Sequence, residues 1–304
     1  MRDLIIVGSG PAGLTAAIYG KRAGLNTLVI DETGIGGGQV TTTYEVDNYP
    51  GLPGIGGFDL GEKFKDHAVS AGAEFMEATV TGAYKNDDVF TVNTSEGQEF
   101  ARAIVIATGA AHSHLNVPGE EELLGMGVSY CATCDGAFFR NRTTAVVGGG
   151  DVALEDALFL ARGCEKVYLI HRRDSFRGAQ KLAELVKSTR NIEIIYDSIV
   201  TEINGEYQVE NIKVDNLKDG TSSLVKVDGI FIAVGMRPTT DAFAGLVELD
   251  DKGYVIAGED GVTSTPGVFV AGDSRTKKVR QIVTAAADGA NAIQSVTDYF
   301  NSLH

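Results

Sequence analysis

The chain has 304 residues, which is long enough for two domains that each bury a core of their own. Its net charge of −15 gives no electrostatic support to nucleic-acid binding. No signal peptide precedes the first predicted strand, and no apolar run is long enough to cross a membrane. We therefore expect a cytoplasmic protein without a membrane segment.

The first predicted unit is a strand, a glycine-rich turn, a helix and a second strand within about thirty residues. Leu4–Val7 is a continuous apolar strand, typical of a parallel sheet covered on both faces, and Thr27–Ile30 is the second strand. A helix that ends near Ala23 lies between them. The turn has the sequence Gly8-Ser9-Gly10-Pro11-Ala12-Gly13. This arrangement predicts a dinucleotide site, with the pyrophosphate at the helix N-terminus.

An acidic residue, Asp31, follows the second strand. A carboxylate at this position can hydrogen-bond a ribose hydroxyl of the dinucleotide, and we count its neighbour Glu32 with it as a predicted contact. Short strands and turns follow, including Thr91–Asn93 and a strand over residues 103–109. The segment over residues 110–118 is predicted to be a linker.

Two of the three cysteines form the sequence Cys131-Ala132-Thr133-Cys134. Such a pair can be half of a zinc site, a structural disulfide or a redox pair. Zinc needs about four ligands and no second pair is present, so we expect no metal. A redox pair is favoured in a reducing compartment, and Asp135 can exchange the proton of its thiol–thiolate couple. Cys164 is expected to be a small, half-buried residue.

The pattern of the first unit recurs in the middle of the chain. Thr144–Val147 and Val167–Ile170 are its predicted strands, and the helix ends near Gly163. The turn between strand and helix has the sequence Gly148-Gly149-Gly150-Asp151-Val152-Ala153. Two such units in one chain predict two bound dinucleotides.

A basic cluster follows the second unit, with the sequence His171-Arg172-Arg173-Asp174-Ser175-Phe176-Arg177. An acid at this strand end would repel a 2′-phosphate, whereas guanidinium groups bind phosphate through charge-assisted hydrogen bonds. The second site therefore indicates NADPH rather than NADH. A solvated basic face would also explain arginines, although not their position at this strand end.

The later strands indicate how the domains are connected. A strand over residues 230–235 precedes a second crossing near Met236–Pro238. A further strand over residues 267–273 and an alanine-rich helix then rejoin the first domain. We predict an α/β fold of two Rossmann-like, three-layer ββα dinucleotide-binding domains, the second inserted into the first. The predicted FAD-binding domain covers 1–112 and 241–304, and the predicted NADPH-binding domain covers 113–240.

Over essentially its full length the chain resembles the low-molecular-weight thioredoxin reductases of bacteria and archaea. The resemblance rests on Gly8–Gly13, Gly37-Gly38-Gln39, Cys131–Gly136, His171–Arg177 and Gly267–Asp273, which occur in the order of that family. The resemblance implies FAD in the first domain. The implied flavin contacts are Gly38, Gln39, Asn48, Thr108, Gly109, Asp273, Arg280, Gln281 and Ile282.

The resemblance also implies unequal roles for the two cysteines. Cys134 would lie against the flavin, Cys131 would attack the disulfide of thioredoxin, and Asp135 would donate a proton. Hydride would pass from NADPH to FAD, and electrons would then reach the dithiol, with rotation of the NADPH-binding domain. A homodimer is usual in the family.

Three alternatives remain open at this stage. The chain could reduce another protein partner, or act as a small-molecule dithiol oxidase that delivers electrons to oxygen. It could also bind flavin without any disulfide turnover, as a redox sensor or a ferredoxin reductase does. The Cys-Ala-Thr-Cys-Asp sequence argues against the last of these.

Overall fold

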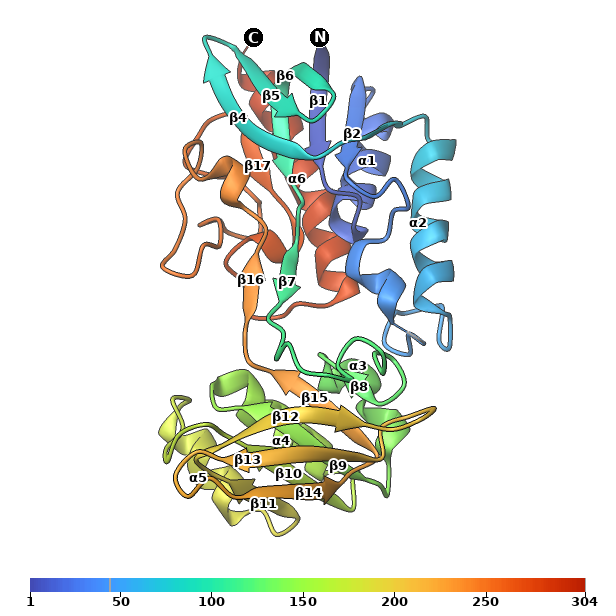
Figure 1. Cartoon of the computed structure of the whole chain (residues 1–304). Helices are drawn as coiled ribbons and strands as arrows, with labels where there is room; N and C mark the ends of the chain where they lie inside the picture. Colours follow the sequence, from blue (N-terminus) through green and yellow to red (C-terminus); the bar gives the residue numbers. More distant parts are fainter. Residues whose placement is uncertain (44, 304) are drawn as a thin grey trace. The chain divides into compact units, whose positions relative to one another are not determined.

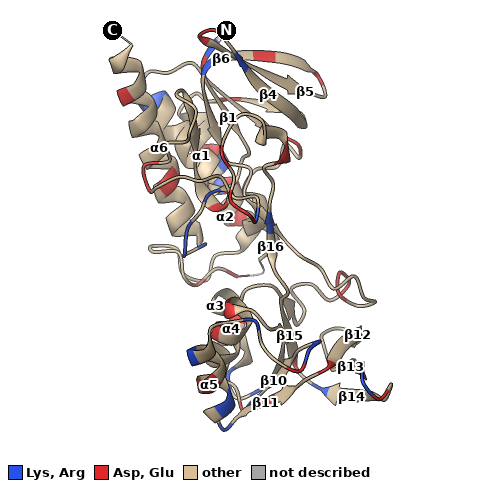
Figure 2. Ribbon diagram, turned by 90° about the vertical axis from the view of Figure 1, so that its left-hand side faces the viewer, with Lys and Arg blue, Asp and Glu red and all other residues tan. Residues whose placement is uncertain are grey.

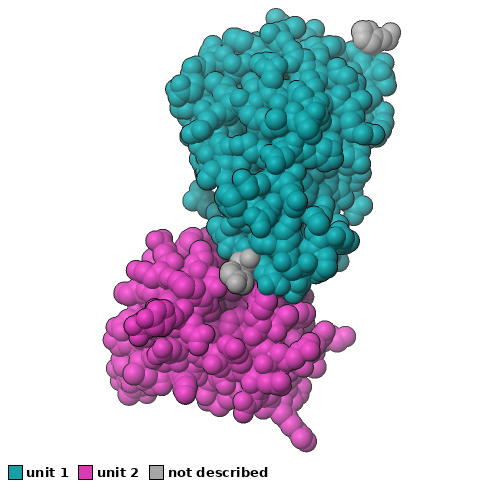
Figure 3. Space-filling model, turned by 90° about the vertical axis from the view of Figure 1, so that its right-hand side faces the viewer, with its two compact units in different colours: residues 1–111, 237–304 teal, residues 112–236 magenta. Residues whose placement is uncertain are grey.

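The computed structural model describes residues 1–43 and 45–303, so Tyr44 and His304 lie outside the described residues. The chain forms two compact units, residues 1–111 with 237–304 and residues 112–236, so that the second unit is inserted into the first (Figure 3). The boundaries between the units lie at 111/112 and 236/237, whereas the sequence analysis placed these boundaries at 112/113 and 240/241.

The first unit contains a seven-stranded sheet in the order β3-β2-β1-β6-β5-β4, with β17 paired to β6 (Figure 1). The pairs β1–β2, β2–β3, β1–β6 and β6–β17 are parallel, and the pairs β5–β6 and β4–β5 are antiparallel. The strands are β1 (Arg2–Val7), β2 (Thr27–Asp31), β3 (Glu74–Glu77), β4 (Val80–Asn86), β5 (Val89–Thr94), β6 (Gly97–Ile106) and β17 (Val268–Val270).

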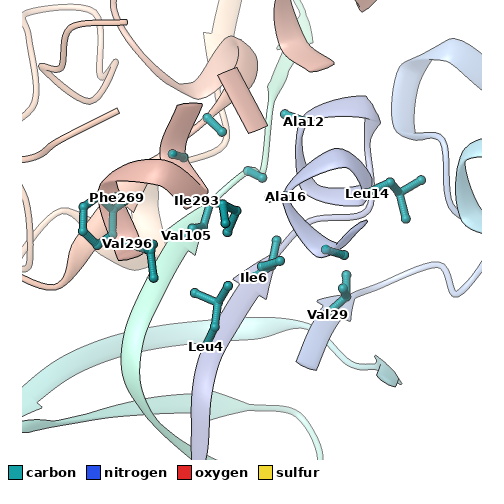
Figure 4. Close-up of a cluster of buried hydrophobic side chains, with 14 of the residues drawn as sticks. Leu4, Ile6, Ala12, Leu14, Ala16, Val29, Val105, Phe269, Ile293 and Val296 are labelled. Carbon is teal, nitrogen blue, oxygen red and sulfur yellow. The ribbon is translucent and has the colours of Figure 1, made fainter. Parts of the chain in front are cut away.

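Both faces of this sheet are buried, which explains the continuous apolar sequence of β1. Leu4 and Ile6 belong to one core cluster, and Ile5 and Val7 belong to another. Because successive side chains of a strand point to opposite faces, these two clusters lie on the two sides of the sheet. The first cluster joins β1 to the helices α1 (Pro11–Arg22) and α6 (Ile282–Ser302) (Figure 4).

The remaining helices of the first unit lie close to its turns and loops. These are α2 (Gly57–Ser70) and the short 3-10 helices η1 (Gly38–Thr42), η3 (Asp241–Phe243) and η4 (Gly272–Ser274). Val40 of η1 and Leu60 of α2 pack in one small core cluster. This cluster fixes the loop that contains η1 against α2.

The second unit repeats the parallel arrangement with five strands in the order β11-β10-β9-β15-β8. The strands are β8 (Val128–Ser129), β9 (Thr143–Gly148), β10 (Lys166–Ile170), β11 (Ile192–Ile195) and β15 (Gly229–Ala233). A separate antiparallel sheet contains β12 (Ser198–Asn204), β13 (Asn211–Asn216) and β14 (Ser222–Lys226). The helices are α3 (Ala132–Asp135), η2 (Gly136–Phe139), α4 (Asp151–Ala161) and α5 (Gln180–Ser188).

Alternate residues of β9 face two different cores. Val146 packs with Leu154 of α4, whereas Ala145 and Val147 pack with Val200 and Ile212 of the antiparallel sheet. The second unit is therefore three-layered, with helices, a parallel sheet and an antiparallel sheet. The predicted fold class, two Rossmann-like domains with one inserted into the other, is confirmed.

The predicted linker over residues 110–118 is only partly irregular. It begins with the short strand β7 (Ala110–His112), which pairs with β16 (Met236–Pro238) of the second crossing. The Ser113 N–H donates to the Gly235 carbonyl at 2.9 Å, and the Thr239 N–H donates to the Gly109 carbonyl at 3.1 Å. The two crossings are thus joined by backbone hydrogen bonds, which the sequence analysis did not predict.

Acidic residues are spread over both units, as the red segments of Figure 2 show. None of the helices in the described part of the chain combines the length and the apolar character that a membrane crossing requires.

A buried ion triad fixes the loop after η4 to α6. Asp288 accepts from the guanidinium of Arg275 at 2.7 and 2.9 Å and from the Lys277 ammonium at 2.9 Å. The three side chains are at most 6% exposed. The backbone N–H of Gly272 also donates to Asp288, at 3.0 Å. Removing the anion would leave two buried cations without their shared partner.

We expect Asp288→Asn to lower the free energy of unfolding by about 3–5 kcal/mol, because a buried charge that loses its partner is strongly destabilising. Urea unfolding of the purified protein measures this change. Asp241→Asn is the control: it removes an exposed ion pair with Arg237, and we expect it to cost less than about 1 kcal/mol. Equal losses in the two variants would contradict the prediction.

Candidate functional site

The first glycine turn lies directly after β1 and opens α1. Gly8 has a φ of +104°, and a β-carbon here would lie only 2.4 Å from the carbonyl oxygen of Ala107, at the end of β6. A β-carbon at Gly13 would overlap the carbonyl of Gly8. No atom of the described residues lies within 4 Å of a β-carbon placed at Gly10, and Gly38 packs against Gly10 from the neighbouring loop. The turn therefore packs tightly against the neighbouring strand at Gly8 and leaves open space at Gly10, as the binding of a pyrophosphate requires.

Asp31 is held at the end of β2 by donors from the turn and from the following loop. Its Oδ2 accepts from the Ser9 N–H at 2.7 Å, and its Oδ1 accepts from the Thr33 N–H at 3.1 Å and hydroxyl at 2.9 Å. Burial alone would raise the pKa of this carboxyl, but these donors outweigh burial and lower the pKa. Asp31 is therefore a fixed carboxylate, whereas Glu32 beside it is exposed.

A cavity of about 230 Å³ begins at Asp31. Its lining residues come from the turn, from the end of β2 and the loop after it, from β3 and from α2. They are Ser9, Asp31, Gly34, Lys65, Phe75, Met76 and Glu77. The sequence analysis missed Lys65 and Glu77, because they lie far from any glycine-rich sequence. Lys65 Nζ donates to the Gly34 carbonyl, which ties α2 to the loop after β2.

Segments that are far apart in the sequence meet at the other predicted contacts of this unit. The Asn48 amide donates to the Gln281 side chain at 2.9 Å, directly before Ile282 opens α6. The Gly37 N–H donates to the Ser9 carbonyl at 2.7 Å, and the exposed Gln39 lies in η1.

Thr108 and Gly109 are joined to the Asp273 segment by a residue that the sequence analysis missed. The buried Ser274 hydroxyl accepts from the Gly109 N–H at 2.8 Å and lies 3.4 Å from the Thr108 hydroxyl. A lone serine gives no signal in the sequence, because its importance depends on this contact.

Among the described residues of this unit, two buried side-chain polar atoms have no hydrogen-bond partner. They are Oδ1 of Asp273 and Nε of Arg280. Burial raises the pKa of Asp273, and Lys277 and Arg280 oppose the shift. The Arg280 guanidinium also lies 4.3 Å from the ring centre of Tyr254. Buried polar atoms of this kind are normally satisfied, so this part of the unit fits a ligand with both hydrogen-bond donors and acceptors.

The second glycine turn has the same geometry as the first. Gly148 has a φ of +155°, and a β-carbon here would lie 2.4 Å from the carbonyl oxygen of Ala233 in β15. No atom lies within 4 Å of a β-carbon placed at Gly150. Asp151 and the exposed Val152 then open α4. This turn also packs tightly against the neighbouring strand, at Gly148, and leaves open space at Gly150.

The basic cluster folds back onto this second turn. The Arg177 N–H donates to the Gly149 carbonyl at 2.8 Å. The imidazole of His171 fills the space where a Gly149 side chain would stand, and its Nε2 donates to the Ser175 carbonyl at 3.0 Å. Burial lowers the pKa of His171, with smaller contributions from Arg173 and Arg177. His171 is thus a neutral spacer between the turn and the arginines.

The guanidinium groups of the cluster are available to an anion. Arg172, Arg173 and Arg177 are all exposed. No carboxylate within residues 1–43 and 45–303 forms an ion pair with any of them. Three free cations beside a glycine turn can bind a phosphate group.

The two cysteines of the second unit form a disulfide, with 5.3 Å between their Cα atoms. Cys131 is the N-cap of the short helix α3, and its carbonyl accepts from the N–H groups of Cys134 at 3.2 Å and Asp135 at 3.1 Å. Burial raises the pKa of the Asp135 carboxyl, although a hydrogen bond from Ser129 opposes this. A carboxyl whose pKa is raised holds its proton more tightly than an ordinary aspartate, which suits a proton donor to sulfur.

In the described part of the chain, no group of three or more His, Cys, Asp or Glu side chains could hold a metal ion. Cys164 is 6% exposed and lies in the core of the second unit, so it is more buried than we expected. Burial also raises the pKa of its thiol. A buried thiol of this kind is unreactive.

A second group of ionisable side chains lies next to the dithiol in the chain, and no sequence motif predicted it. The buried Glu120 carboxylate accepts from the Tyr130 hydroxyl at 2.7 Å and from the N–H groups of Leu115 at 3.0 Å and Asn116 at 2.6 Å. The Tyr130 hydroxyl also lies 2.8 Å from Nδ1 of His114. Burial and Glu120 raise the pKa of Tyr130, which therefore stays a neutral donor. These contacts tie the residue before Cys131 to the crossing segment.

Comparisons with known proteins agree with this arrangement. The sequence model of a family described as pyridine nucleotide-disulphide oxidoreductase matches residues 2–289. A thioredoxin reductase of Listeria monocytogenes is 46% identical over 302 residues, which cover 99% of this chain and 94% of that protein.

Two solved structures are similar over the whole chain. The thioredoxin reductase of Streptococcus pyogenes has a TM-score of 0.94 at 40% identity, with 99% of both chains covered. The thioredoxin reductase of Lactococcus lactis, in its FR conformation, has a TM-score of 0.69 at 39% identity, with 99% of this chain and 100% of that chain covered.

Asp156 on α4 provides a pH-dependent prediction. Burial, and then the charge of Glu155, raise the pKa of this carboxyl to about 7. The folded protein therefore binds this proton more tightly than the unfolded chain, whose carboxyl has a pKa of about 4. We expect the free energy of unfolding to fall as the pH rises from about 4 to 7, because the stabilisation is lost as the carboxyl ionises.

Asp156→Asn should remove this part of the pH dependence, which urea unfolding at a series of pH values measures. Glu206→Gln, which changes an exposed carboxylate of the same unit, is the control and should keep the slope of the parent protein. An unchanged slope in Asp156→Asn would show that this carboxyl does not hold its proton.

Proposed function

The chain belongs to the pyridine nucleotide-disulphide oxidoreductase family, and we propose that it acts as an NADPH-dependent thioredoxin-disulfide reductase. The observation that carries the proposal is the Cys131–Cys134 disulfide beside the buried Asp135, in the same unit as a glycine turn and three unpaired arginines. Full-length relatives that bear the name thioredoxin reductase support the same conclusion.

FAD is the group that we assign to the first unit. Its pyrophosphate would lie at the turn of Gly8, Gly10 and Gly13, and the cavity that begins at Asp31 would take the adenosine end. The atoms of Asp273 and Arg280 that lack a hydrogen bond fit the polar groups of the same molecule. The remaining contacts that we assign are Ser9, Pro11, Ala12, Glu32, Gly38, Gln39, Asn48, Thr108, Gly109, Gln281 and Ile282.

NADPH is the group that we assign to the second unit. Gly148, Gly149 and Gly150 would face its pyrophosphate, and Asp151 and Val152 open the helix behind it. Arg172, Arg173 and Arg177, spaced from the turn by His171, would hold the 2′-phosphate. Bound together, NADPH and FAD supply the hydride and the electron pair that reduce the Cys131–Cys134 disulfide.

The chain's own residues then perform the exchange with thioredoxin. The Cys131 thiolate attacks the thioredoxin disulfide, a mixed disulfide forms, and the leaving sulfur takes a proton from Asp135. The ionised Asp135 next removes the proton of Cys134. The Cys134 thiolate attacks Cys131, which re-forms the intramolecular disulfide, and the second thioredoxin sulfur leaves as a thiolate that water protonates.

One dithiol has to react in turn with a flavin and with a protein, so we assign to the second unit a rotation about its two crossings. The paired strands β7 and β16 are the residues that such a rotation would involve. The FR conformation named for the L. lactis relative supports this assignment. We further propose a homodimer that acts in the cytoplasm.

The choice of nucleotide can be tested at the arginines. We expect Arg172→Ala with Arg173→Ala to raise the NADPH concentration needed for half-maximal flavin reduction more than about 100-fold, because two charge-assisted hydrogen bonds are lost and each costs about 1.5–3 kcal/mol. The response to NADH should stay unchanged, since NADH has no 2′-phosphate. Stopped-flow absorbance of the flavin measures both.

Arg190→Ala is the matched control, because Arg190 is an exposed arginine of the same unit outside the cluster. It should leave the response to both nucleotides unchanged. A parent protein whose flavin bleaches equally with NADH and NADPH would contradict the role of the arginines.

The role of the dithiol can be tested separately. Cys131→Ser and Cys134→Ser should each reduce the rate of NADPH-driven thioredoxin reduction more than about 100-fold, because neither variant can form the disulfide that carries the electrons. Reduction of an artificial dye by NADPH should persist, since it needs no cysteine. Cys164→Ala is the control and should keep both activities. Thioredoxin reduction that survives the loss of Cys131 would reject the proposed function.

A further inference from the structure

Ser129 lies at the end of β8, two residues before Cys131, and is 5% exposed. Its backbone is fixed by the pairing of β8 with β15, in which Ser129 faces Phe231. No part of the proposed exchange has so far used this side chain. Its position between the dithiol and the proton donor distinguishes it from the other serines of the unit.

The Ser129 hydroxyl is bonded to both of the elements that the exchange requires. It donates to Oδ2 of Asp135 at 2.6 Å, and it accepts from the backbone N–H of Cys131 at 3.0 Å. The Cys131 carbonyl, at 3.4 Å, is a more distant alternative acceptor. Because the N–H of Cys131 occupies one lone pair of the hydroxyl oxygen, the hydroxyl proton is directed toward Asp135.

The two carboxyl oxygens of Asp135 are consequently not equivalent. Oδ2 accepts the serine hydroxyl, whereas none of the described residues donates a hydrogen bond to Oδ1. Oδ1 is not a buried atom without a partner, so part of its surface is exposed to solvent. A neutral carboxyl with one oxygen held as an acceptor carries its proton on the other oxygen.

We propose that Ser129 is a positioning residue for proton transfer, which holds Oδ2 of Asp135 and leaves Oδ1 as the oxygen that carries the proton. The proton leaves Oδ1 for the sulfur released during exchange, and the carboxylate that remains keeps the serine hydrogen bond. The carboxyl therefore stays in one place in both charge states. The inference rests on the proposed function, but it concerns atoms that can be observed without any partner protein.

Several ionisable groups lie around Asp135, but none of them is a cause of its shifted pKa. Helix α4, which packs against α3, carries Asp151, Glu155 and Asp156, and on the other side of Cys131 lie Tyr130, Glu120 and His114. Burial and Ser129 are the causes of the shifted pKa of Asp135, and no ion pair contributes to it. Replacing Ser129 therefore isolates the hydrogen bond.

Infrared difference spectra of the oxidised holoenzyme over a pH series test the inference, with Asp135→Asn as the spectral reference. In Ser129→Ala, the C=O stretch of the neutral Asp135 should move to higher frequency, because its carbonyl oxygen Oδ2 loses a donor. The pH at which this band disappears should rise, because the hydroxyl no longer stabilises the carboxylate. Ser129→Thr should restore both properties.

The matched control is Ser222→Ala. Ser222 donates to Asp215 at 2.7 Å, a serine–aspartate bond of similar length, but in an exposed sheet that lacks cysteines. This variant should leave the Asp135 band unchanged. An Asp135 band with the same frequency and the same midpoint in Ser129→Ala as in the parent protein would overturn the proposal.

Kinetics provide a second measurement. Ser129→Ala should slow thioredoxin reduction about tenfold through misplacement of the acid, and NADPH-driven flavin reduction should be unaffected. The infrared result stands whether or not thioredoxin is the partner, so failure of the proposed function is distinguishable from failure of this inference. A rate equal to that of the parent protein at every pH would show that Ser129 does not position the acid.

Discussion

In each unit, the turn after the first parallel strand passes so close to the neighbouring strand that no β-carbon fits. Gly8 meets the carbonyl of Ala107, and Gly148 meets the carbonyl of Ala233. This close approach brings the helix N-terminus over the carboxyl edge of the sheet, where backbone N–H groups are free to meet an anion. Because this arrangement depends on backbone sterics, it can occur in both units of one chain. The difference between the two sites comes from the side chains at the following strand ends.

Burial affects the carboxyls of the molecule in opposite ways, according to the donors around them. Asp31 is partly buried, yet two donors from Thr33 and one from Ser9 keep it ionised. Asp135 is half-buried and has a single donor, so burial outweighs that donor and the pKa is raised. An ionised group suits a structural contact with a ribose, and a protonated group suits proton transfer to sulfur.

The glycine turns, the continuous apolar strands and the order of the elements were predictable from the sequence, because each depends on residues close together in the chain. Some strand and helix ends differ from the prediction by one or two residues; Asp31, for example, belongs to β2 rather than following it. Others differ by more: the strand predicted over residues 103–109 is β6, Gly97–Ile106, and the strand predicted over 267–273 is β17, Val268–Val270. Ser274, Glu120 and Asp288 were missed. Their roles arise from contacts with residues that lie between 4 and 166 positions away in the chain and follow no periodic pattern. The individual site residues assigned to FAD and NADPH stay predictions.

The segment from Ser129 to Asp135 shows how little sequence is needed to give two cysteines unequal surroundings. Cys131 caps α3, its N–H is held by Ser129, and the preceding Tyr130 is bonded to Glu120 of the crossing segment. Cys134 lies inside α3, directly before Asp135. Because Ser129 and Tyr130 are adjacent in the chain, the proton donor and the crossing segment are both bonded to the residues that precede Cys131. Hydrogen bonds to the acid and to the crossing segment therefore fix the same short stretch of backbone before Cys131.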